Sequence, residues 1–556
     1  MGTDAARHAL AAWRASYPDD PFAEDRHLRA LLARHLPADR CRDLEARASV
    51  FAREVTGVVG PAAARYEQRG HLPELARWDP VGRRTESVQF DPDYHRAGRR
   101  VWASGLVALS DVPGSAYEQA VLLYLLSSEG EAGHACPATC TIGLARALRR
   151  AADPSVRDRF LPSLVDTDYR TAVRGSQFLT EVQGGSDVGA NTCLAAPTGD
   201  GTTYRVTGEK WFCSVADAGL FFLTARVPDG PDGTRGLGSF VVPREIDGRP
   251  NGFALRRLKD KLGTRGLASG EIDFDGALAW PVGPVEHGFR TAVGVVLNTS
   301  RWMTAVGGAG MMRRAWLEAS AYTRHRTAFG SPIGRFPAVR RTLADMAAVS
   351  VGALHLVVAL TGLEDRIDDG TAGGADALVH RFLVDVAKYV VSVQATGVVH
   401  SAIEVLGGNG AIEDFSVLPR LYRDAIVYES WEGSHNVLVA QVCNDLRRLP
   451  ILDAVGHWLT GVVAAVDDTV LAAALTSGID QALESAQRCA DDPVTGEWHF
   501  RDVVDRLGLL AEAALLAGAG ESALAGHLLA GPSGNLDPAG DPELPGRVEA
   551  VLDAMG

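Results

Sequence analysis

The feature that most constrains this chain is a change of hydrophobic period near its middle. From Gly175 to about residue 287, short apolar runs with Gly, Pro and Asp between them are typical of strands. On either side, apolar residues recur at helical spacing. The candidate strands cover residues 176–180, 204–212, 220–227, 238–243 and 270–274. The pattern predicts a mostly α-helical protein with a central β domain.

Length then sets the number of domains, because a chain of 556 residues is too long for one ordinary core. Long apolar-periodic segments with short connections predict an antiparallel four-helix bundle after the β domain. Its expected helices are 289–326, 337–369, 376–406 and one after Glu432. The expected segments are a helical N-terminal extension over 1–75, a helical domain over 76–174, the β domain over 175–287, the bundle over 288–446 and an additional acidic helical segment over 447–556.

Charge and composition argue against several partners. The net charge is −14, and residues 441–556 hold 18 Asp and Glu, six Arg and no Lys, so we expect no nucleic-acid binding. No run of about 18 uncharged apolar residues is present, and Met1–Arg14 lacks a secretory apolar core, so we expect neither a membrane span nor a secretory signal. Seven scattered Cys without a CxxC pair predict buried thiols in a reducing cytoplasm and no metal site.

The segment 400–436 holds the clearest chemistry. An apolar helix ends at the Gly-Gly-Asn-Gly run 407–410, whose residues tolerate left-handed backbone. Further on, Glu432 lies between the indole of Trp431 and Gly433. A carboxylate beside an indole, with a glycine that leaves space in front of it, predicts a general base with a raised pKa. The alternative is an acid that complements the dipole of the following helix.

Two further features are weaker signals. The turn 181–187, Glu-Val-Gln-Gly-Gly-Ser-Asp, follows a candidate strand and can present backbone N–H groups to a phosphate. His134 interrupts a helical pattern and could line a pocket, but a hydrogen-bonded structural histidine is the commoner case.

Five motifs occur in one order along the chain: Thr180-Glu-x-x-x-Gly-Ser-Asp187, Gly208-Glu-Lys-Trp-Phe-Cys-Ser214, Arg326-x-x-Phe-Gly330, Leu406-Gly-Gly-Asn-Gly410 and Trp431-Glu-Gly433. With the helix–β–helix pattern they resemble the acyl-CoA dehydrogenase family. The Arg-Leu-Lys-Asp-Lys-Leu-Gly run is similar to its AidB-like, adaptive-response branch. The resemblance covers about residues 75–446. It implies an N-terminal helical domain, a middle β-barrel or sandwich and a C-terminal four-helix bundle.

The resemblance also implies an FAD held between the β domain and the bundle. Arg326, Phe329 and the run 407–410 match residues that reach the FAD of a neighbouring subunit, which implies a homo-oligomer, a dimer or a tetramer. Ser434 and Asn436 match residues at the adenosine-diphosphate end of FAD, near a helix N-terminus. The full implied cofactor set is Phe178, Leu179, Thr180, Gly185, Ser186, Phe212, Ser214, Arg326, Phe329, Gly407, Gly408, Asn409, Gly410, Ser434 and Asn436.

Glu432 matches the family's catalytic base, which removes the α-proton of an acyl thioester while the β-hydride passes to flavin N5. Arg301 and Gly433 match substrate-side residues, and Asn298 stands where some dehydrogenases carry an acid. The implied activity is dehydrogenation of an acyl-CoA or a carrier-bound acyl group, with an unidentified electron acceptor. The alternatives are a nitroalkane-oxidase-like flavoprotein, which Glu432 disfavours because those enzymes use Asp, and a DNA-associated stress flavoprotein, which the acidic C-terminus disfavours.

Overall fold

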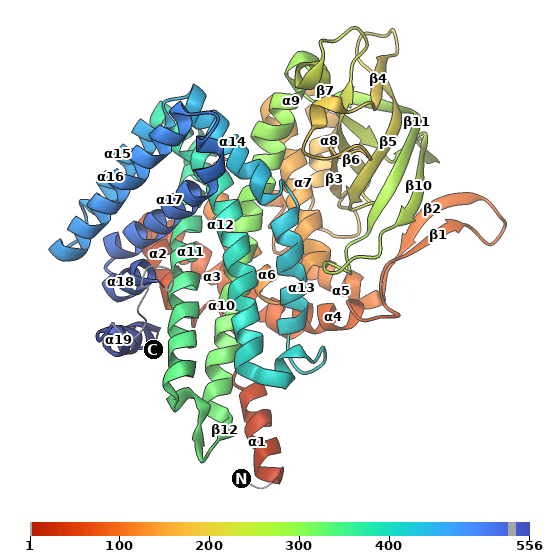
Figure 1. The fold of residues 1–556 in the computed structure, drawn as a ribbon. Helices are drawn as coiled ribbons and strands as arrows, with labels where there is room; N and C mark the ends of the chain where they lie inside the picture. Colours follow the sequence, from red (N-terminus) through yellow and green to blue (C-terminus); the bar gives the residue numbers. More distant parts are fainter. Residues whose placement is uncertain (1–2, 532–540, 556) are drawn as a thin grey trace. The chain divides into compact units, whose positions relative to one another are not determined.

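The computed structural model describes residues 3–531 and 541–555, and the chain divides into two compact units (Figure 1). The β unit is Glu54–Met303. The bundle unit combines Met1–Arg53 with Thr304–Gly556. Helix α10 (Asn298–His325) begins in the β unit and ends in the bundle unit.

The helices of the β unit precede its sheet in the chain. Two of them begin with the same signal, an Asp cap followed by Pro: Asp91 caps α5 and Asp153 caps α8. Glu131 caps α7 by accepting the backbone N–H groups of His134 and Ala135. The helices are α4 (Gly60–Tyr66), α5 (Pro92–Ala103), α6 (Ala116–Ser128), α7 (Ala132–Ala151) and α8 (Pro154–Leu164).

One part of this region differs from the sequence expectation. Residues expected to be helical form an antiparallel hairpin of β1 (Glu74–Trp78) and β2 (Arg84–Gln89). The turn is held by Asp79, whose carboxylate accepts the backbone N–H groups of Val81 and Arg83. The strands are mostly polar, so they lack the apolar alternation by which a strand is recognised. The hydrogen bonds of the Asp79 turn and the pairing of the two strands stabilise a hairpin that the residue composition does not predict.

The sheet carries the site residues of this unit. Strand β11 pairs with β5 and β7, β6 pairs with β7 and β4, and β4 pairs with β5, so these five strands form a closed circuit, as in a barrel. β3 adds to β6 in parallel, and β10 adds to β11. The strands are β3 (Gly175–Phe178), β4 (Leu194–Pro197), β5 (Tyr204–Ser214), β6 (Leu220–Arg226), β7 (Leu237–Pro243), β10 (Phe253–Leu258) and β11 (Ser269–Pro281).

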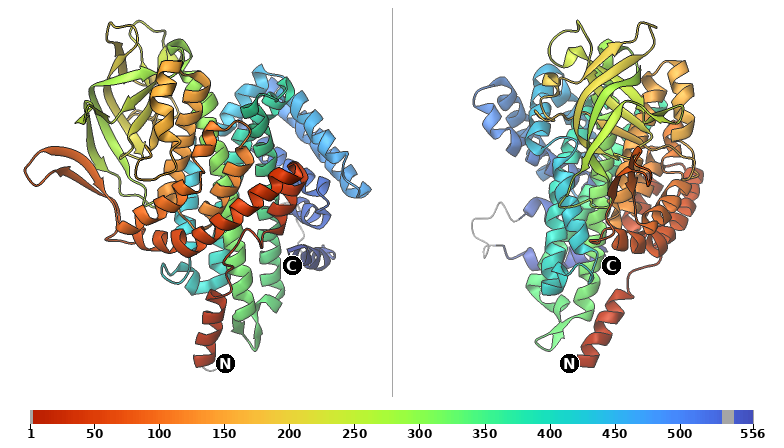
Figure 2. Two further views of the ribbon diagram at one scale, coloured as in Figure 1. Left: turned by 180° about the vertical axis from the view of Figure 1, so that it is seen from behind. Right: turned by 90° about the vertical axis from the view of Figure 1, so that its right-hand side faces the viewer.

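Helices α7 and α8 cover the sheet near β3 (Figure 2). Leu144 and Leu148 of α7 share a buried core with Phe160 of α8 and Phe222 of β6. Burying a large apolar side chain is worth about 1.5–3 kcal/mol. The apolar stripes of the helices therefore fix β3, and the loop after it, against the sheet.

The bundle unit is built on long helices joined by short segments. α11 (Pro337–Asp369) and α12 (Gly374–Leu406) pack along each other, and α13 (Leu418–Ser430) and α14 (His435–Arg448) pack on α12. Pro337 in the first turn of α11 and Gly370, left-handed at φ 80°, after its last turn give the helix the bounds that the sequence predicts. Both long helices have stretches apolar enough to cross a membrane. The protein buries 89% and 72% of those stretches, as expected for core helices of a bundle.

The acidic C-terminal region packs on this bundle. Helix α17 contacts α11, α12, α14 and α16, and α18 and α19 contact α11. The C-terminal helices are α15 (Ile451–Val463), α16 (Thr469–Asp491), α17 (Gly496–Gly518), α18 (Ser522–Ala530) and α19 (Leu544–Met555). The region after residue 446 therefore shares a core with the bundle.

The N-terminal helices of the unit are α1 (Thr3–Arg14), α2 (Arg26–His35) and α3 (Ala38–Glu54).

Candidate active site

Three predicted flavin residues meet on the sheet of the β unit. The backbone N–H of Trp211 donates to the carbonyl of Thr180 at 3.0 Å, so the end of β3 lies beside β5. On β5, Phe212 is 57% exposed, and Ser214 pairs with Ser269 of β11. Thr180, Phe212 and Ser214 thus belong to one part of the sheet, with an aromatic ring and two hydroxyls available to a ligand.

Phe178 and Leu179 are placed differently. The Phe178 side chain is fully buried, 5.2 Å from the ring of Phe221, so it offers a ligand its backbone only. The Leu179 carbonyl accepts the side-chain amide of Asn191 at 2.7 Å. These two residues hold the strand in place. Of these three residues, Thr180 is the one with a partly exposed side chain.

The turn 181–187 is anchored by Glu181, a residue of the predicted motif that was not itself predicted to have a role. Glu181 is buried and accepts Lys210 Nζ at 2.9 Å and the backbone N–H groups of Thr192 and Cys193. Burial raises the pKa of Glu181, but Lys210 and the backbone donors outweigh it, and the pKa falls below its usual value. A charged Glu181 thus fixes the start of the turn that presents Gly185 and Ser186.

Two backbone features support this part of the site. A Cβ at Gly185 would lie 2.6 Å from the hydroxyl of Thr180, so a larger residue would push into that side chain. Val215, directly after Ser214, is left-handed at φ 57°, which a β-branched residue rarely adopts. Such strain persists where the surroundings fix the backbone, and it is commonest at functional sites.

Arg301 lies in the second turn of α10 and is buried. The segment directly before α10, Ala292–Leu297, is a wide π-type turn, a feature frequent at functional sites. Asn298, at the start of α10, has a buried side-chain oxygen without a hydrogen-bond partner among residues 3–531 and 541–555. Gln177 of β3 donates to Ser300 at 2.9 Å, which ties the start of α10 to the sheet.

In the bundle unit, Glu432 lies on the link between α13 and α14. Trp431 ends α13, Glu432 is left-handed at φ 56°, Gly433 follows at φ 111°, and Ser434 precedes α14 as its N-cap. Glu432 therefore lies outside both helices, two residues before the cap. Its side chain is half-buried, and the ring of Trp431 packs 4.5 Å from that of Tyr428. The link thus carries a half-buried carboxylate outside both helices.

Lys388 fixes this link. Its side chain is fully buried in α12, and Nζ donates to the carbonyls of Glu429 at 3.0 Å and Gly433 at 2.8 Å. The two carbonyls flank Glu432 in sequence. Lys388 is not among the site residues predicted from the sequence, although a lone lysine in an apolar helical run is a visible signal.

The other two titratable groups near Glu432 contact each other. Glu429 accepts the Thr396 hydroxyl, and its second oxygen lies 3.6 Å from His435 Nε2. Burial, and then Lys388, lower the pKa of His435 below its usual value. Both side chains are engaged in this contact, and the half-buried Glu432 lies between them in sequence, on the bend of the link.

The remaining predicted cofactor residues lie at the far end of α12. Asn409 donates to the Tyr322 hydroxyl at 3.1 Å, and the Tyr322 carbonyl accepts the backbone N–H of Arg326. A Cβ at Gly410 would lie 2.3 Å from the Ile403 carbonyl, so only glycine fits there. At the tip of the β12–β13 hairpin (Thr327–Ala328, Ser331–Pro332), Phe329 is 99% exposed.

The predicted flavin residues of the bundle unit therefore form two separate groups. Lys388, which holds the Glu432 link, and Leu406, which precedes Gly407, are 18 residues apart on α12, or about 27 Å along a helix. Ser434 and Asn436 belong to the first group. Arg326, Phe329 and the run 407–410 belong to the second.

The residues present fit an FAD. Phe212 and Phe329 expose aromatic rings, and Arg326 has no hydrogen-bond or ion-pair partner for its guanidinium among the described residues. Gly407 and Gly408 leave open space where a side chain would be. The seven cysteines are free thiols. In the described part of the chain, no group of three or more His, Cys, Asp or Glu side chains could hold a metal ion.

Comparison with known domains defines the class of protein. The N-terminal domain of the adaptive response protein AidB matches residues 14–171. The middle domain of acyl-CoA dehydrogenases matches residues 176–277, and their C-terminal domain matches residues 286–446. A helical domain, a β domain and a helical bundle in this order are those of a flavoprotein dehydrogenase.

Whole-chain comparisons agree. AidB of Escherichia coli strain K12 is 34% identical over 388 residues, 68% of this chain and 69% of the relative. The chain belongs to the acyl-CoA dehydrogenase family and is an oxidoreductase of that type. The solved structure of ACDH-11 from Caenorhabditis elegans, in complex with C11-CoA, has a TM-score of 0.85 at 26% identity and covers 96% of this chain and 90% of that one.

The cofactor prediction is confirmed for the family, whose members bind FAD. An acyl-CoA dehydrogenase of Bacillus anthracis complexed with FAD has the same fold, with a TM-score of 0.69 at 20% identity over 92% of this chain and 86% of that one. The family and fold predictions are likewise confirmed. The roles of individual residues stay predictions.

Proposed function

We propose that this protein binds FAD and dehydrogenates an acyl-CoA between Cα and Cβ, with Glu432 as the base that removes the α-proton. The observation that carries the proposal is the link between α13 and α14. It holds one glutamate in a left-handed bend, between an indole and a glycine, through a buried lysine. Few structural roles require that geometry, whereas a base that must approach a substrate carbon does.

The residues proposed to contact the cofactor are those that match the family's motifs. Thr180, Phe212 and Ser214 would contact the ring system, and Ser434 and Asn436 the adenosine-diphosphate end. FAD supplies a hydride acceptor at flavin N5 when bound. Arg326 suits a phosphate, since a guanidinium is a planar and permanently charged donor.

The chain's own residues would carry out the proton chemistry. An α-C–H is a weak acid, so its removal needs a carboxylate that is poorly solvated and a thioester carbonyl that is polarised. The Trp431 ring and Gly433 give Glu432 such surroundings, and the backbone N–H of Glu432 is a candidate donor to the carbonyl.

The acyl-CoA class of substrate rests on the family and on the C11-CoA bound by ACDH-11. The test is anaerobic titration of the yellow protein with acyl-CoA thioesters of increasing chain length, with flavin absorbance as the readout. We expect stoichiometric bleaching with at least one thioester. If no saturated acyl-CoA bleaches the flavin, and a nitroalkane does, the oxidase alternative replaces the proposal.

A further inference from the structure

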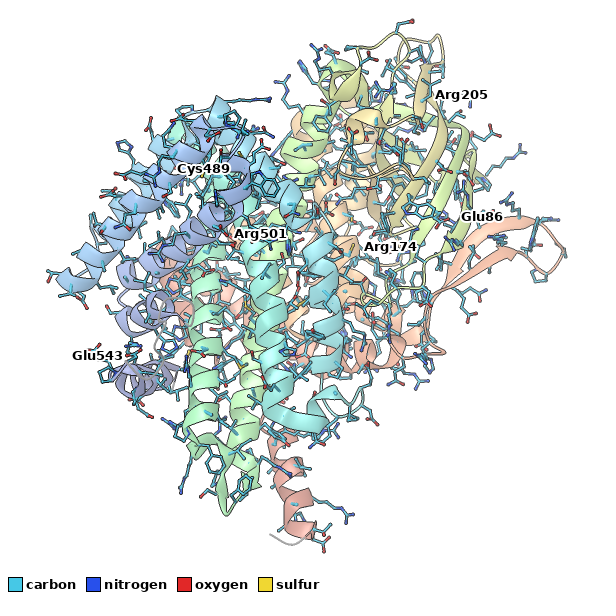
Figure 3. All side chains as sticks on the ribbon, viewed as in Figure 1. Glu86, Arg174, Arg205, Cys489, Arg501 and Glu543 are labelled. Atoms are coloured by element: carbon cyan, nitrogen blue, oxygen red, sulfur yellow. The ribbon has the colours of Figure 1, made fainter. Side chains whose placement is uncertain are left out.

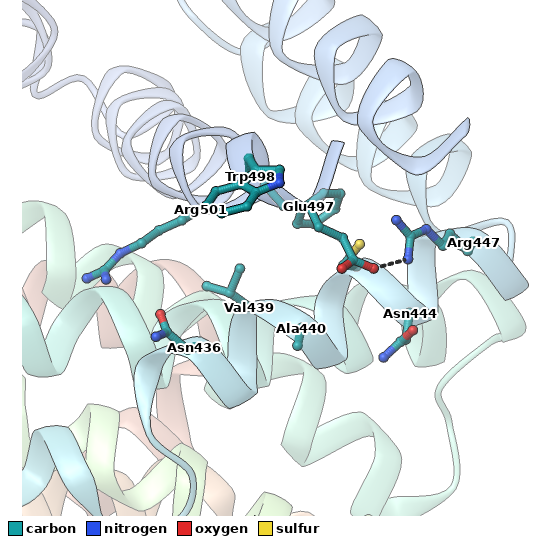
Figure 4. A pocket seen from close by; sticks show the side chains of 10 residues that line it. Asn436, Val439, Ala440, Asn444, Arg447, Glu497, Trp498 and Arg501 are labelled. Atoms are coloured by element: carbon teal, nitrogen blue, oxygen red, sulfur yellow. Dashed lines mark hydrogen bonds and ion pairs between the residues drawn. The ribbon is translucent and has the colours of Figure 1, made fainter. Parts of the chain in front are cut away.

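A cleft lies between α14 and α17, inside the bundle unit (Figure 4). Its volume is about 530 Å³, which falls in the range of small-molecule sites. One wall runs along α14 from Asn436 to Arg447, and this helix begins directly after the Glu432 link. The other wall comes from the start of α17, in the C-terminal region beyond the three matched domains.

The middle of the cleft suits a flat aromatic group. Val439 and Ala440 line the α14 wall, and the indole of Trp498 stands over them (Figure 4). Trp498 is 84% exposed, a large apolar ring that the protein leaves in contact with water. A nucleobase of any kind can stack on such a ring, because every base has a flat π-face.

One end of the cleft suits an anion. Arg501, on α17 (Figure 3), uses Nε to donate to the Tyr389 hydroxyl at 3.0 Å, and Tyr389 in turn donates to Asp505 at 2.5 Å. The guanidinium also lies over the Tyr389 ring, 5.5 Å from its centre, and its Nη groups have no hydrogen-bond partner in residues 3–531 and 541–555. Asn436 faces the same end, in the first turn of α14. The Ser434 side chain makes no cap hydrogen bond, and its carbonyl accepts the N–H groups of Val437 and Leu438, so the N–H groups before Val437 are those that a phosphate could use.

The other end offers polar groups for a base or a ribose. Arg447 Nη1 donates to Glu497 at 3.0 Å across the cleft, which joins α14 to α17. Nη2 of the same guanidinium is buried and has no hydrogen-bond partner in the described part of the chain. The amide of Asn444 lies beside this pair (Figure 4). A cationic end, an aromatic centre and an amide-lined end follow each other along one cleft.

We propose that this cleft binds the adenosine-diphosphate part of an adenine cofactor, with the diphosphate at Arg501 and Asn436 and the adenine against Trp498. The inference rests on the proposed function, because FAD and CoA both carry this group. Asn436 lies both in the cleft and in the FAD set implied by the sequence, which favours FAD as the source. The C-terminal region would then complete a cofactor site, through residues of α17.

The experiment uses the holoprotein and four variants. Arg501→Ala and Trp498→Ala each remove one wall group, Arg501→Lys keeps the cation, and Arg488→Ala removes an exposed arginine of the neighbouring α16 as the control. FAD affinity is measured by fluorescence of the cofactor released on serial dilution. CoA and ADP affinities are measured by calorimetry. Melting temperatures verify the fold.

If FAD fills the cleft, Arg501→Ala and Trp498→Ala weaken FAD binding about tenfold or more, Arg501→Lys loses less, and ADP does not bind the wild-type holoprotein. If CoA fills it, FAD affinity is unchanged, ADP binds the holoprotein, and both Ala variants weaken CoA and ADP about tenfold. Both results support an adenosine-diphosphate site and identify its source.

Unchanged affinities for FAD, CoA and ADP in both Ala variants would overturn the inference. So would equal losses in Arg501→Ala and Arg501→Lys together with a lower melting temperature, because that pattern shows a structural arginine. The proposed function is tested apart from this, by bleaching of the wild-type flavin with acyl-CoA. If acyl-CoA bleaches the wild-type flavin while the variants bind FAD, CoA and ADP normally, the proposed function stands and only the inference about the cleft is refuted.

Discussion

At the scale of single residues, the backbone of Glu432 is the most informative feature. A glutamate at φ 56° is uncommon, and adopting such a conformation costs on the order of 1–3 kcal/mol. An acid that served the helix dipole could stand in the first turn of α14 without that cost. The structure places Glu432 before the cap residue Ser434, outside the helix. The backbone thus favours the general base over the helix-terminal acid.

Glu432→Gln tests this directly. The amide keeps the size and hydrogen bonding of the carboxylate but cannot take a proton, so we expect FAD binding and folding to persist. The single-turnover rate of flavin reduction should fall at least about a hundredfold, the scale of removing a general base. Glu404→Gln, on an exposed face of α12, is the control. A Glu432→Gln protein that reduces its flavin at the wild-type rate removes Glu432 from the mechanism.

Lys388→Met probes the residue that positions Glu432. The change leaves the carbonyls of Glu429 and Gly433 without their buried donor. We expect FAD to be retained while flavin reduction slows by about tenfold or more, since a small displacement of a catalytic group is costly. The measurement is the single-turnover rate at saturating substrate. A lower melting temperature with an unchanged rate would show that Lys388 serves stability alone.

At the scale of elements, α17 carries a second buried carboxyl. Glu512 faces α11 and α12, accepts the Gln394 amide at 2.9 Å and leaves its other oxygen without a partner among the described residues. Burial raises the pKa of Glu512 to about 8. The folded state thus holds a proton that the unfolded chain releases near its usual pKa of 4.5. The contribution of Glu512 to the free energy of unfolding is therefore fully present below pH 4.5 and is lost as pH rises through about 8.

We therefore expect Glu512→Gln to raise the melting temperature most at alkaline pH. The gain should grow between pH 5 and 8 and reach at least about 2 °C at pH 8. Thermal unfolding at three pH values measures it, and Glu484→Gln, exposed on α16, is the control. A gain that does not depend on pH would mean that Glu512 is charged in the folded protein.

Much of the helical architecture could be predicted from local signals. The helix expected over 337–369 has those bounds, and the one expected over 376–406 begins two residues earlier, because Pro and Gly mark their ends. Lys388 could not be assigned a role, because its partners lie 41 and 45 residues further along the chain. The β1–β2 hairpin was missed because its strands are polar. Nor does the sequence show that α17 forms a cleft with α14.

At the scale of the whole molecule, the two groups of cofactor residues on the bundle predict shared sites. They are about 27 Å apart along α12, so we propose that Arg326, Phe329 and the run 407–410 complete the site of a neighbouring copy. The exposure of Phe329 on a hairpin tip is what a contact with another subunit requires. We expect a closed homo-oligomer, a dimer or a tetramer.

Subunit mixing tests the shared site. Arg326→Ala and Glu432→Gln are each expected to be nearly inactive. In a mixed dimer, one site combines an intact Glu432 with an intact Arg326 from the other copy, so an equimolar mixture should recover up to about a quarter of wild-type activity. The measurement is the activity of co-expressed variants carrying different tags. No recovery in an assembly shown to contain both variants would place all these residues in one subunit's site.

The charge of the molecule gives a prediction about nucleic acid. With a net charge of −14 and an acidic C-terminal region, the chain carries a charge of the same sign as DNA, which opposes binding by the release of counterions. We expect anisotropy titrations with random duplex to show no binding tighter than about 10 µM at physiological salt. Sub-micromolar affinity that falls steeply with salt would revive the DNA-associated alternative.

The buried position of Lys388 has a consequence for proteolysis. Of the 55 Lys and Arg residues in the chain, four are lysines: Lys210, Lys259, Lys261 and Lys388. A lysine-specific endoprotease can therefore cut the bundle unit at one bond, in the middle of α12, where the side chain is fully buried. Release of the fragment 389–556 then reports how often α12 opens around the Glu432 link. A ligand that closes this link should lengthen the lifetime of the intact chain.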